Sequence, residues 1–175
     1  MVKYLSMFWL AITAWALTLS SPQIHGTFAR PQIFDRYGCE GANLSPSLVW
    51  QGAPDGTRSF AVTMFDPDAP TGHGWWHWIL YDIPSSVRSL PEGAGTRGHS
   101  GLPAGAKQAR NDYGEMGYGG PCPPKGATPH RYIVTLYALD IPRLPVSSRA
   151  SALEILTAIL AHTIAQASIV ARYGR

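Results

Sequence analysis

Two carboxylates and two histidines stand at the ends of apolar runs, where a chain can bring polar groups together. Asp66 and Asp68 follow one alternating run, and His77 begins the next. His130 begins a third run and shares its phase with Tyr132, since residues two apart on a strand point to the same face. Imidazole N–H and phenol O–H groups donate hydrogen bonds to phosphate oxygens, and a glycine-rich loop can add backbone N–H groups. These residue types predict a cavity for a small anion, in which Asp66 would orient a histidine.

A second chemistry is open to the same residues. Asp66, His77 and His130 could hold Zn²⁺ with one free position, as in a zinc-dependent hydrolase. However, the sequence contains neither HExxH nor another close pair of ligands, and nothing obvious supplies a separate general base. It also lacks the GxSxG nucleophile elbow of serine hydrolases. We therefore expect a binding site without turnover, metal or cofactor, with the zinc hydrolase as the alternative.

Three strands are expected to position these residues. Phe60 to Phe65 alternates in the period-2 pattern of a half-buried strand, and prolines in the following turn end it because they lack the N–H that a sheet needs. Trp76 to Tyr81 and His130 to Leu139 are rich in aromatic and β-branched residues, which favours strands. If the first two strands pair, Asp66 and His77 lie near the same end of the sheet.

The rest of the chain predicts short elements and one long helix. Leu48 to Trp50 is typical of an edge or first strand, and residues 85–115 show no sustained period, so we expect short irregular elements around the pocket. From Leu153 to Val170 apolar residues recur at helical spacing. Ser151 followed by Glu154 is a capping-box pattern, so a C-terminal helix of about five turns should cover the sheet. The predicted fold is mainly β, with antiparallel sheets, short helices and this C-terminal helix.

Composition limits the function classes. The 175 residues fit one domain, and the 18 glycines and 15 prolines suit short strands joined by many turns. Charged residues make up 14% and hydrophobic residues 45%, which excludes a disordered chain. The formal net charge of +3 comes from scattered basic residues without a basic run, so we expect no nucleic-acid partner.

Two motifs resemble those of a known family. The segment DPDAP at residues 66–70, followed by WHW at residues 76–78, is similar to the first signature of the phosphatidylethanolamine-binding protein family. The segment GYGGPCPPKG at residues 117–126, running on to HRY at residues 130–132, is similar to the second. The resemblance extends from residue 33 to the C-terminus and is closest to the bacterial Raf-kinase-inhibitor-like branch.

The resemblance implies an antiparallel β fold with a small anion pocket for phosphate-like or phospholipid head groups and no established catalysis. It also permits a kinase or protease as a protein target, which no sequence feature locates. At Trp76 the better-known animal members carry a histidine, so the rim of this pocket should be more apolar and its ligand need not be a phospholipid. The candidate ligand-binding residues are Asp66, Asp68, Pro70, Trp76, His77, Gly120, Pro121, His130 and Tyr132.

The two cysteines, Cys39 and Cys122, both lie in family-like motifs. In an oxidising compartment they could form one disulfide that closes a long loop. Alternatively, they could be two separate thiols that pack as small hydrophobic side chains. The sequence gives no distance between them, so both interpretations stay open.

Residues 1–26 have the features of an export signal. Lys3 gives the positive start, Met7 to Leu19 is an uninterrupted run of apolar residues and threonines, and small residues follow. The strictly apolar stretch is shorter than the roughly 20 residues of a membrane-spanning helix, so we expect no stable span after processing. We expect residues 27–175 to form a periplasmic or secreted domain, with the cleavage point left open.

The export signal can be tested with a reporter fusion. Residues 1–30 joined to a reporter that is active only outside the cytoplasm should give activity, because Lys3 and the apolar run direct export. Replacing two leucines of the run, Leu10 and Leu17, by arginine should abolish that activity. A wild-type fusion whose reporter stays in the cytoplasm would contradict the prediction.

Overall fold

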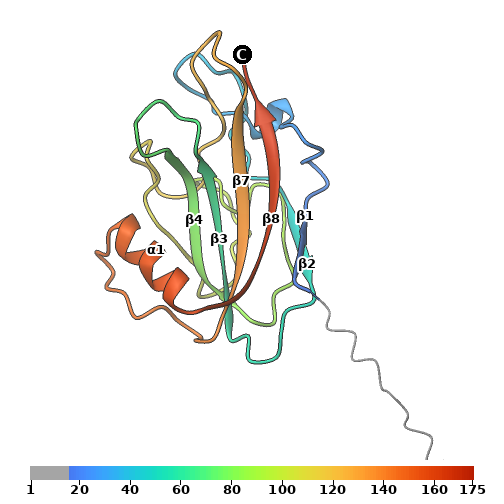
Figure 1. The fold of residues 1–175 in the computed structure, drawn as a ribbon, viewed down its shortest axis with the longest axis vertical. Coiled ribbons are helices and arrows are strands. Elements are labelled where there is room, and N and C mark those ends of the chain that lie inside the picture. The colour runs from blue at the N-terminus through green and yellow to red at the C-terminus, as the bar shows by residue number, and fades with distance from the viewer. Residues whose placement is uncertain (1–15) are drawn as a thin grey trace, which may run out of the picture.

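Two antiparallel sheets and one α-helix form the fold of residues 16–175, which the computed structural model describes (Figure 1). The large sheet has five strands in the order β6-β4-β3-β7-β8, and the small sheet has three in the order β1-β2-β5. The mainly β, antiparallel fold class predicted from the sequence is confirmed. The elements are β1 Thr18–Ser20, the 3-10 helix η1 Arg30–Gln32, β2 Leu48–Gln51, β3 Ser59–Asp66, β4 Trp75–Pro84, β5 Ser89–Leu90, β6 Lys107–Gln108, β7 His130–Leu139, α1 Ala152–Ala161 and β8 Thr163–Tyr173.

The three strands predicted to carry the site lie side by side. β3 pairs with β4 on one side and with β7 on the other, both antiparallel. Asp66, the last residue of β3, is opposite Trp75 at the start of β4, while Phe65 is opposite Ile133 near the start of β7. Because the three strand ends coincide, polar residues far apart in sequence meet at one end of the sheet.

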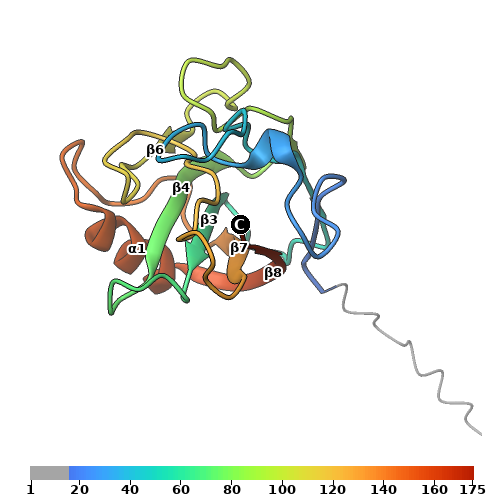
Figure 2. The ribbon, with the colours of Figure 1, turned by 90° about the horizontal axis from the view of Figure 1, so that it is seen from above.

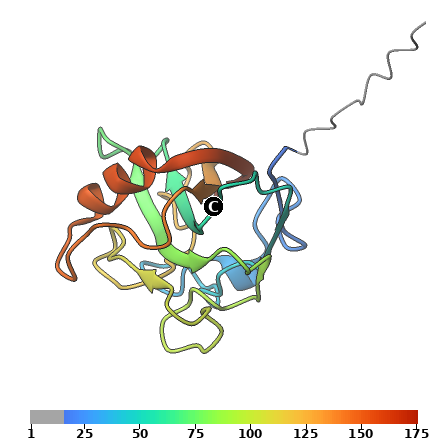
Figure 3. The same ribbon diagram turned by 90° about the horizontal axis from the view of Figure 1, so that it is seen from below.

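The large sheet is covered on both faces. Alternate residues of β3, such as Phe60 and Met64, point into a cluster shared with Trp50 of the small sheet. The other face packs against α1, where Tyr137 and Ile159 belong to a second buried cluster. The helix and the N-terminal part of the chain therefore lie on opposite sides of the large sheet (Figure 2), an arrangement also visible from below (Figure 3).

The prediction of a long C-terminal helix is correct only for the first part of the segment. Its start is confirmed, since Ser151 caps α1 and forms the capping box with Glu154. The helix ends at Ala161, however, and Thr163–Tyr173 forms β8, which pairs with β7 along its length. The apolar residues of this segment fit both periods, and hydrogen bonding to β7 determines the result because strand preference depends on context.

The short elements agree in part with expectation. Residues 85–115 contain only the two-residue strands β5 and β6 among irregular turns, as predicted. β2 contains the predicted Leu48 to Trp50 but is the central strand of the small sheet, with β1 and β5 on its two sides. The expectation of an edge or first strand was wrong because β1, which precedes it, was not predicted.

Most of the predicted export signal lies outside the described residues. Its last part belongs to the fold, because β1 pairs with β2 and Leu19 is buried. Removal of residues 1–26 would therefore delete β1, whereas a cut before Thr18 would keep the small sheet whole. In residues 16–175 no helix has the length and apolar character needed to cross a membrane.

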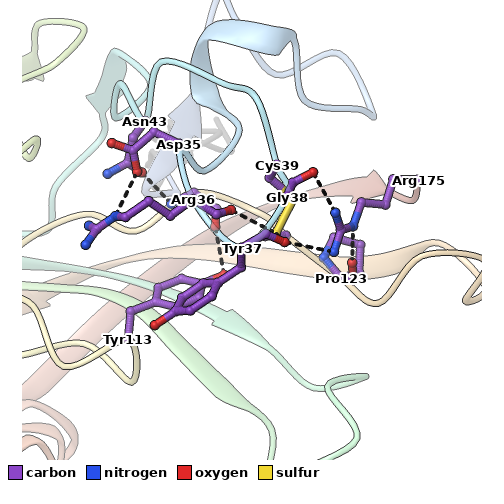
Figure 4. Close-up of a disulfide and its surroundings, with 11 residues drawn as sticks. Asp35, Arg36, Tyr37, Gly38, Cys39, Asn43, Tyr113, Pro123 and Arg175 are labelled. Carbon is purple, nitrogen blue, oxygen red and sulfur yellow. Dashed lines mark hydrogen bonds and ion pairs between the residues drawn. A yellow bond between two sulfur atoms is a disulfide. The ribbon is translucent and has the colours of Figure 1, made fainter.

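A disulfide and an arginine join two loops near the C-terminus (Figure 4). Cys39 and Cys122 are bonded, with their Cα atoms 6.0 Å apart. Beside them the guanidinium of Arg175 donates from Nη1 to the Gly38 carbonyl (2.8 Å) and from Nε to the Pro123 carbonyl (2.7 Å). The covalent bond and the hydrogen bonds hold the same two loops together.

This disulfide predicts a redox-dependent stability. The folded protein, denatured without reductant, should show no titratable thiol, and reduction should lower its free energy of unfolding by on the order of 4 kcal/mol, since the bond closes a long loop. Thiol titration and urea unfolding with and without reductant measure both effects. A Cys39→Ser, Cys122→Ser double variant is the control, because its stability should not respond to reductant. Two free thiols in the unreduced protein would contradict the bond.

Candidate functional site

A cavity of about 330 Å³ lies where β3 ends and where β4 and β7 begin. Five of the residues predicted from the sequence line it, namely Asp66, Pro70, His77, His130 and Tyr132. The remaining wall comes from loops and from the start of β4, with Tyr37, Ala69, Thr71, Trp75, Asp112, Tyr113, Cys122, Pro123 and Pro124. The antiparallel pairing of the three strands accounts for this convergence.

Asp66 and His130 form a buried pair at the base of the cavity. The Nδ1–H of His130 donates to Oδ2 of Asp66 over 2.7 Å, and the backbone N–H of Asp68 donates to Oδ1 over 2.8 Å. Asp66 is 3% exposed and His130 is 6% exposed. Since a carboxylate can only accept here, the pair places the proton on Nδ1 and leaves Nε2 of His130 as the atom it can offer to a ligand.

His77 is held by a β-bulge and by one glycine. Phe65 pairs with Trp76 and Met64 pairs with Trp78, so His77 has no partner of its own in β3. Instead, its carbonyl accepts from the Gly119 N–H over 2.8 Å and its Nδ1 bonds to the Gly119 carbonyl over 2.7 Å. Bulges often redirect side chains next to binding sites, and this one sends the imidazole toward the cavity.

The tautomer of His77 follows from its partner. A carbonyl oxygen only accepts hydrogen bonds, so Nδ1 carries the proton. Burial lowers the pKa of His77 to about 4, against the hydrogen bond to Gly119 and the charge of Asp66, which act to raise it. At neutral pH the imidazole is therefore uncharged, and its Nε2 presents a lone pair. A ligand meeting this atom must bring a proton with it.

Aromatic rings form much of the cavity wall. The ring of Tyr132 lies edge-on to His77, with centroids 5.1 Å apart, and Tyr113 also packs edge-on to His77, with centroids 5.5 Å apart. Burial and the nearby Asp66 charge raise the pKa of the Tyr132 phenol, so its hydroxyl remains protonated. Within the described part of the chain, this hydroxyl and the indole N–H of Trp75 are buried without a hydrogen-bond partner. Both are donors that the fold leaves unused.

Asp68 and Trp76 belong to the predicted set but do not line this cavity. Asp68 instead binds Arg131, accepting from Nη2 (2.6 Å), Nε (2.9 Å) and the backbone N–H (2.8 Å). Trp76 points to the opposite face of the sheet and packs at a tilt against Phe65, with ring centroids 4.4 Å apart. The strand period thus brings Trp75, and not Trp76, to the rim as its apolar residue.

Gly120 and Pro121, which also belong to the predicted set, do not line the cavity either. The Gly120 N–H donates to Oδ1 of Asn43 over 2.7 Å, and a Cβ on this glycine would stand 2.3 Å from the backbone oxygen of Gln32. The Pro121 carbonyl accepts from the Phe34 N–H over 3.2 Å. These two residues shape the loop that carries the cavity without contacting its interior.

Among the lining residues that sequence reasoning did not identify are Tyr37, Trp75, Asp112 and Tyr113. Trp75 could have been found, since it is two residues before His77 on the same strand. The other three lie on loops without periodicity, and their positions depend on tertiary contacts. One such contact is between Asp112 and Trp76, whose backbone N–H donates to the carboxylate over 2.7 Å.

The charges around the cavity limit what it can hold. It is lined by the carboxylates of Asp66 and Asp112 and by two histidines, with no lysine or arginine among the lining residues that the structure describes. Nowhere in residues 16–175 do three or more His, Cys, Asp or Glu side chains lie close enough together to hold a metal ion. Within this described part of the chain, the zinc hydrolase alternative therefore has no complete set of ligands.

Relatives of the chain share its sequence over most of its length. The UPF0098 protein YbcL of Escherichia coli is 51% identical over 141 residues, covering 81% of this chain and 77% of YbcL. YbhB of the same organism is 48% identical over 142 residues, covering 81% and 89% respectively. A protein of Aquifex aeolicus is 41% identical over 141 residues, covering 79% of each chain.

Solved structures agree with these relatives. The crystal structure of Escherichia coli YbcL, described as a new member of the mammalian PEBP family, matches with a TM-score of 0.87 and 46% identity over 91% of this chain and 98% of YbcL. CT736 of Chlamydia trachomatis matches with a TM-score of 0.71 and 33% identity, covering 92% of this chain and 99% of that one. The family model for phosphatidylethanolamine-binding proteins matches residues 21–174, and the chain therefore belongs to the phosphatidylethanolamine-binding protein family.

Proposed function

We propose that this protein is a non-catalytic, exported binding module whose cavity takes a small head group bearing both a phosphate and an amine. The observation that carries the proposal is the mixed lining of one cavity. Unused donors lie beside two histidines, while two carboxylates are present without a lysine or arginine among the described lining residues. A bare anion would meet these carboxylates without compensation, whereas a zwitterion offers a charge to each kind of group.

The phosphate would bind at the base of the cavity. The Tyr132 hydroxyl is a protonated donor, and the Nε2 atoms of His77 and His130 are the free positions of rings already fixed by Gly119 and Asp66. His77 is uncharged, so a proton must be shared between its Nε2 and a phosphate oxygen. That proton is available when the ligand is a phosphate monoester in its monoanionic form, since the second pKa of such a group is about 6. Phosphate binding should therefore weaken as pH rises above this value.

The amine would bind nearer the mouth. Asp112 is exposed and keeps one carboxylate oxygen beyond the one that accepts from Trp76. The rings of Trp75 and Tyr113 stand beside it, 5.3 Å apart between centroids. Aromatic faces next to a carboxylate attract ammonium groups. Phosphatidylethanolamine, which the family description names, also carries a phosphate and an amine, but its phosphate is a diester without the proton that Nε2 of His77 needs, so a monoester such as O-phosphoethanolamine fits this site better.

For a protein target such as a kinase or protease, the exposed mouth of the cavity offers one surface of contact. Tyr37 lines the cavity and is 71% exposed. Exposed tyrosines are common anchors at protein interfaces. This side chain supports the regulatory role as a second candidate.

Measurements of ligand affinity distinguish the proposed binding module from a zinc hydrolase. His130→Ala and Tyr132→Phe should each weaken binding of O-phosphoethanolamine about tenfold or more, because each removes a hydrogen bond to a charged group. Asp112→Asn should weaken O-phosphoethanolamine but leave inorganic phosphate unchanged. Isothermal titration calorimetry measures the affinity for both ligands. His162→Ala is the control, because His162 bonds to Asp140 and does not line the cavity.

Chelation gives the opposite outcomes for the two candidates. A chelator should leave phosphoethanolamine binding intact in the module, whereas it would remove activity from a zinc hydrolase. Binding that survives the loss of both His77 and His130 would contradict the proposed site, whereas stoichiometric metal lost together with a hydrolase activity would favour the enzyme.

Burial of His77 predicts an acid-sensitive fold. Its folded pKa is about 4 and its ordinary value 6.5, so the unfolded chain binds more protons between these pH values. Stability is therefore complete above pH 6.5 and falls as pH drops toward 4, by on the order of 3 kcal/mol. Urea unfolding at pH 7 and pH 5 should show a smaller loss for His77→Gln than for wild type or the His162→Gln control. An equal loss in all three proteins would contradict this.

A further inference from the structure

A second groove, of about 440 Å³, lies next to the cavity. The two share Pro70, Pro124 and His130 as walls. Arg131 and Arg172 line only the second groove. A ligand seated in the cavity against His130 is therefore next to a surface with a different charge.

The charges in this groove are not balanced. Arg131 of β7 is directly opposite Arg172 of β8, and two like charges at such positions repel. Asp68 offsets the first of them, since both of its oxygens bind Arg131. Its carboxylate is firmly ionised, because the hydrogen bonds from Arg131 lower its pKa to about 2. In the part of the chain that the structure describes, no side chain forms an ion pair with Arg172.

Protection of a sheet edge does not explain the charge of Arg172. Charged residues on edge strands commonly prevent pairing with other chains. Here, however, the edge is already occupied, because the Arg172 N–H donates to the Gly26 carbonyl (2.9 Å) and its carbonyl accepts from the Thr27 hydroxyl (3.0 Å). The backbone is thus satisfied while the guanidinium remains exposed beside the cavity.

We propose that Arg172 forms a second oxyanion subsite, which binds a carboxylate or phosphate carried by the same ligand whose head group fills the cavity. This inference rests on the proposed function. The planar guanidinium can hold such a group through two parallel hydrogen bonds. The bound oxyanion would lie between Arg172 and the shared His130 wall, where it would also relieve the repulsion with Arg131. The module would then prefer head groups with one additional negative charge.

O-phosphoethanolamine and O-phospho-L-serine are two probes that differ by one carboxylate group. O-phospho-L-serine carries the phosphate and amine of O-phosphoethanolamine together with a carboxylate. Calorimetry should show that the wild-type protein binds phosphoserine about threefold to tenfold more tightly, with a preference that falls as salt is added. Arg172→Gln should remove the preference and leave phosphoethanolamine unchanged, and Arg172→Lys should restore part of it. Because the side chain is exposed and its backbone stays paired, these variants are expected to fold.

Arg58→Gln is the matched control. It removes the same charge from an exposed arginine at the other end of β3, so the preference for phosphoserine should persist. Equal binding of the two probes by the wild-type protein, or an unchanged preference in Arg172→Gln, would overturn the subsite while leaving the proposed function intact. Failure of the wild-type protein to bind either probe would overturn the proposed function and the subsite together. Pyrophosphate and inorganic phosphate, compared in the same way, distinguish a phosphate from a carboxylate as the second group.

Discussion

The arrangement of the site depends on one buried carboxylate that must be satisfied. Asp66 is almost completely enclosed, and an unpaired charge at such depth would destabilise the fold by several kcal/mol. Its two oxygens are occupied by the Asp68 N–H in the following turn and by His130 at the start of β7. One acid therefore fixes the end of β3, the turn and the neighbouring strand, and it also sets the tautomer of the histidine that lines the cavity.

The sequence could predict this convergence because it follows from strand period and turn chemistry. His130 and Tyr132 share a face, and β7 has the bounds that its aromatic and β-branched content indicated. The same logic excludes Trp76, which only the family resemblance indicated, because its neighbours Trp75 and His77 are the residues that face the cavity. A bulge is not visible in a hydrophobic pattern, since it depends on which carbonyl and N–H groups of a distant loop are available. Here those groups belong to Gly119, where a Cβ would stand 2.5 Å from the Tyr113 ring.

The parts that could not be predicted are those that tertiary contacts decide. Residues 163–173 fit a helix as well as a strand, and ten paired positions with β7 make them a strand. The strand conformation of this segment also determines the charge of the groove, because a helix continuing from α1 would not have placed Arg172 opposite Arg131. Tyr37 and Tyr113 reach the cavity through aromatic stacking on Phe34 and through the loops that the Cys39–Cys122 bond joins. Neither the stacking nor the distance between the cysteines can be read from local sequence.

The distribution of charge differs between the cavity and the neighbouring groove. The cavity contains carboxylates and uncharged donors, so it favours a ligand that brings its own positive group. The neighbouring groove contains two guanidiniums and one carboxylate, so it favours a negative group. His130 stands between them and is held from behind by Asp66, so it cannot turn away from either. Under the proposed function, a ligand that fills both the cavity and the groove would carry a phosphate, an amine and a second oxyanion. Under the proposed function, the separation of charge on the two sides of His130 would provide selectivity that the cavity alone does not provide.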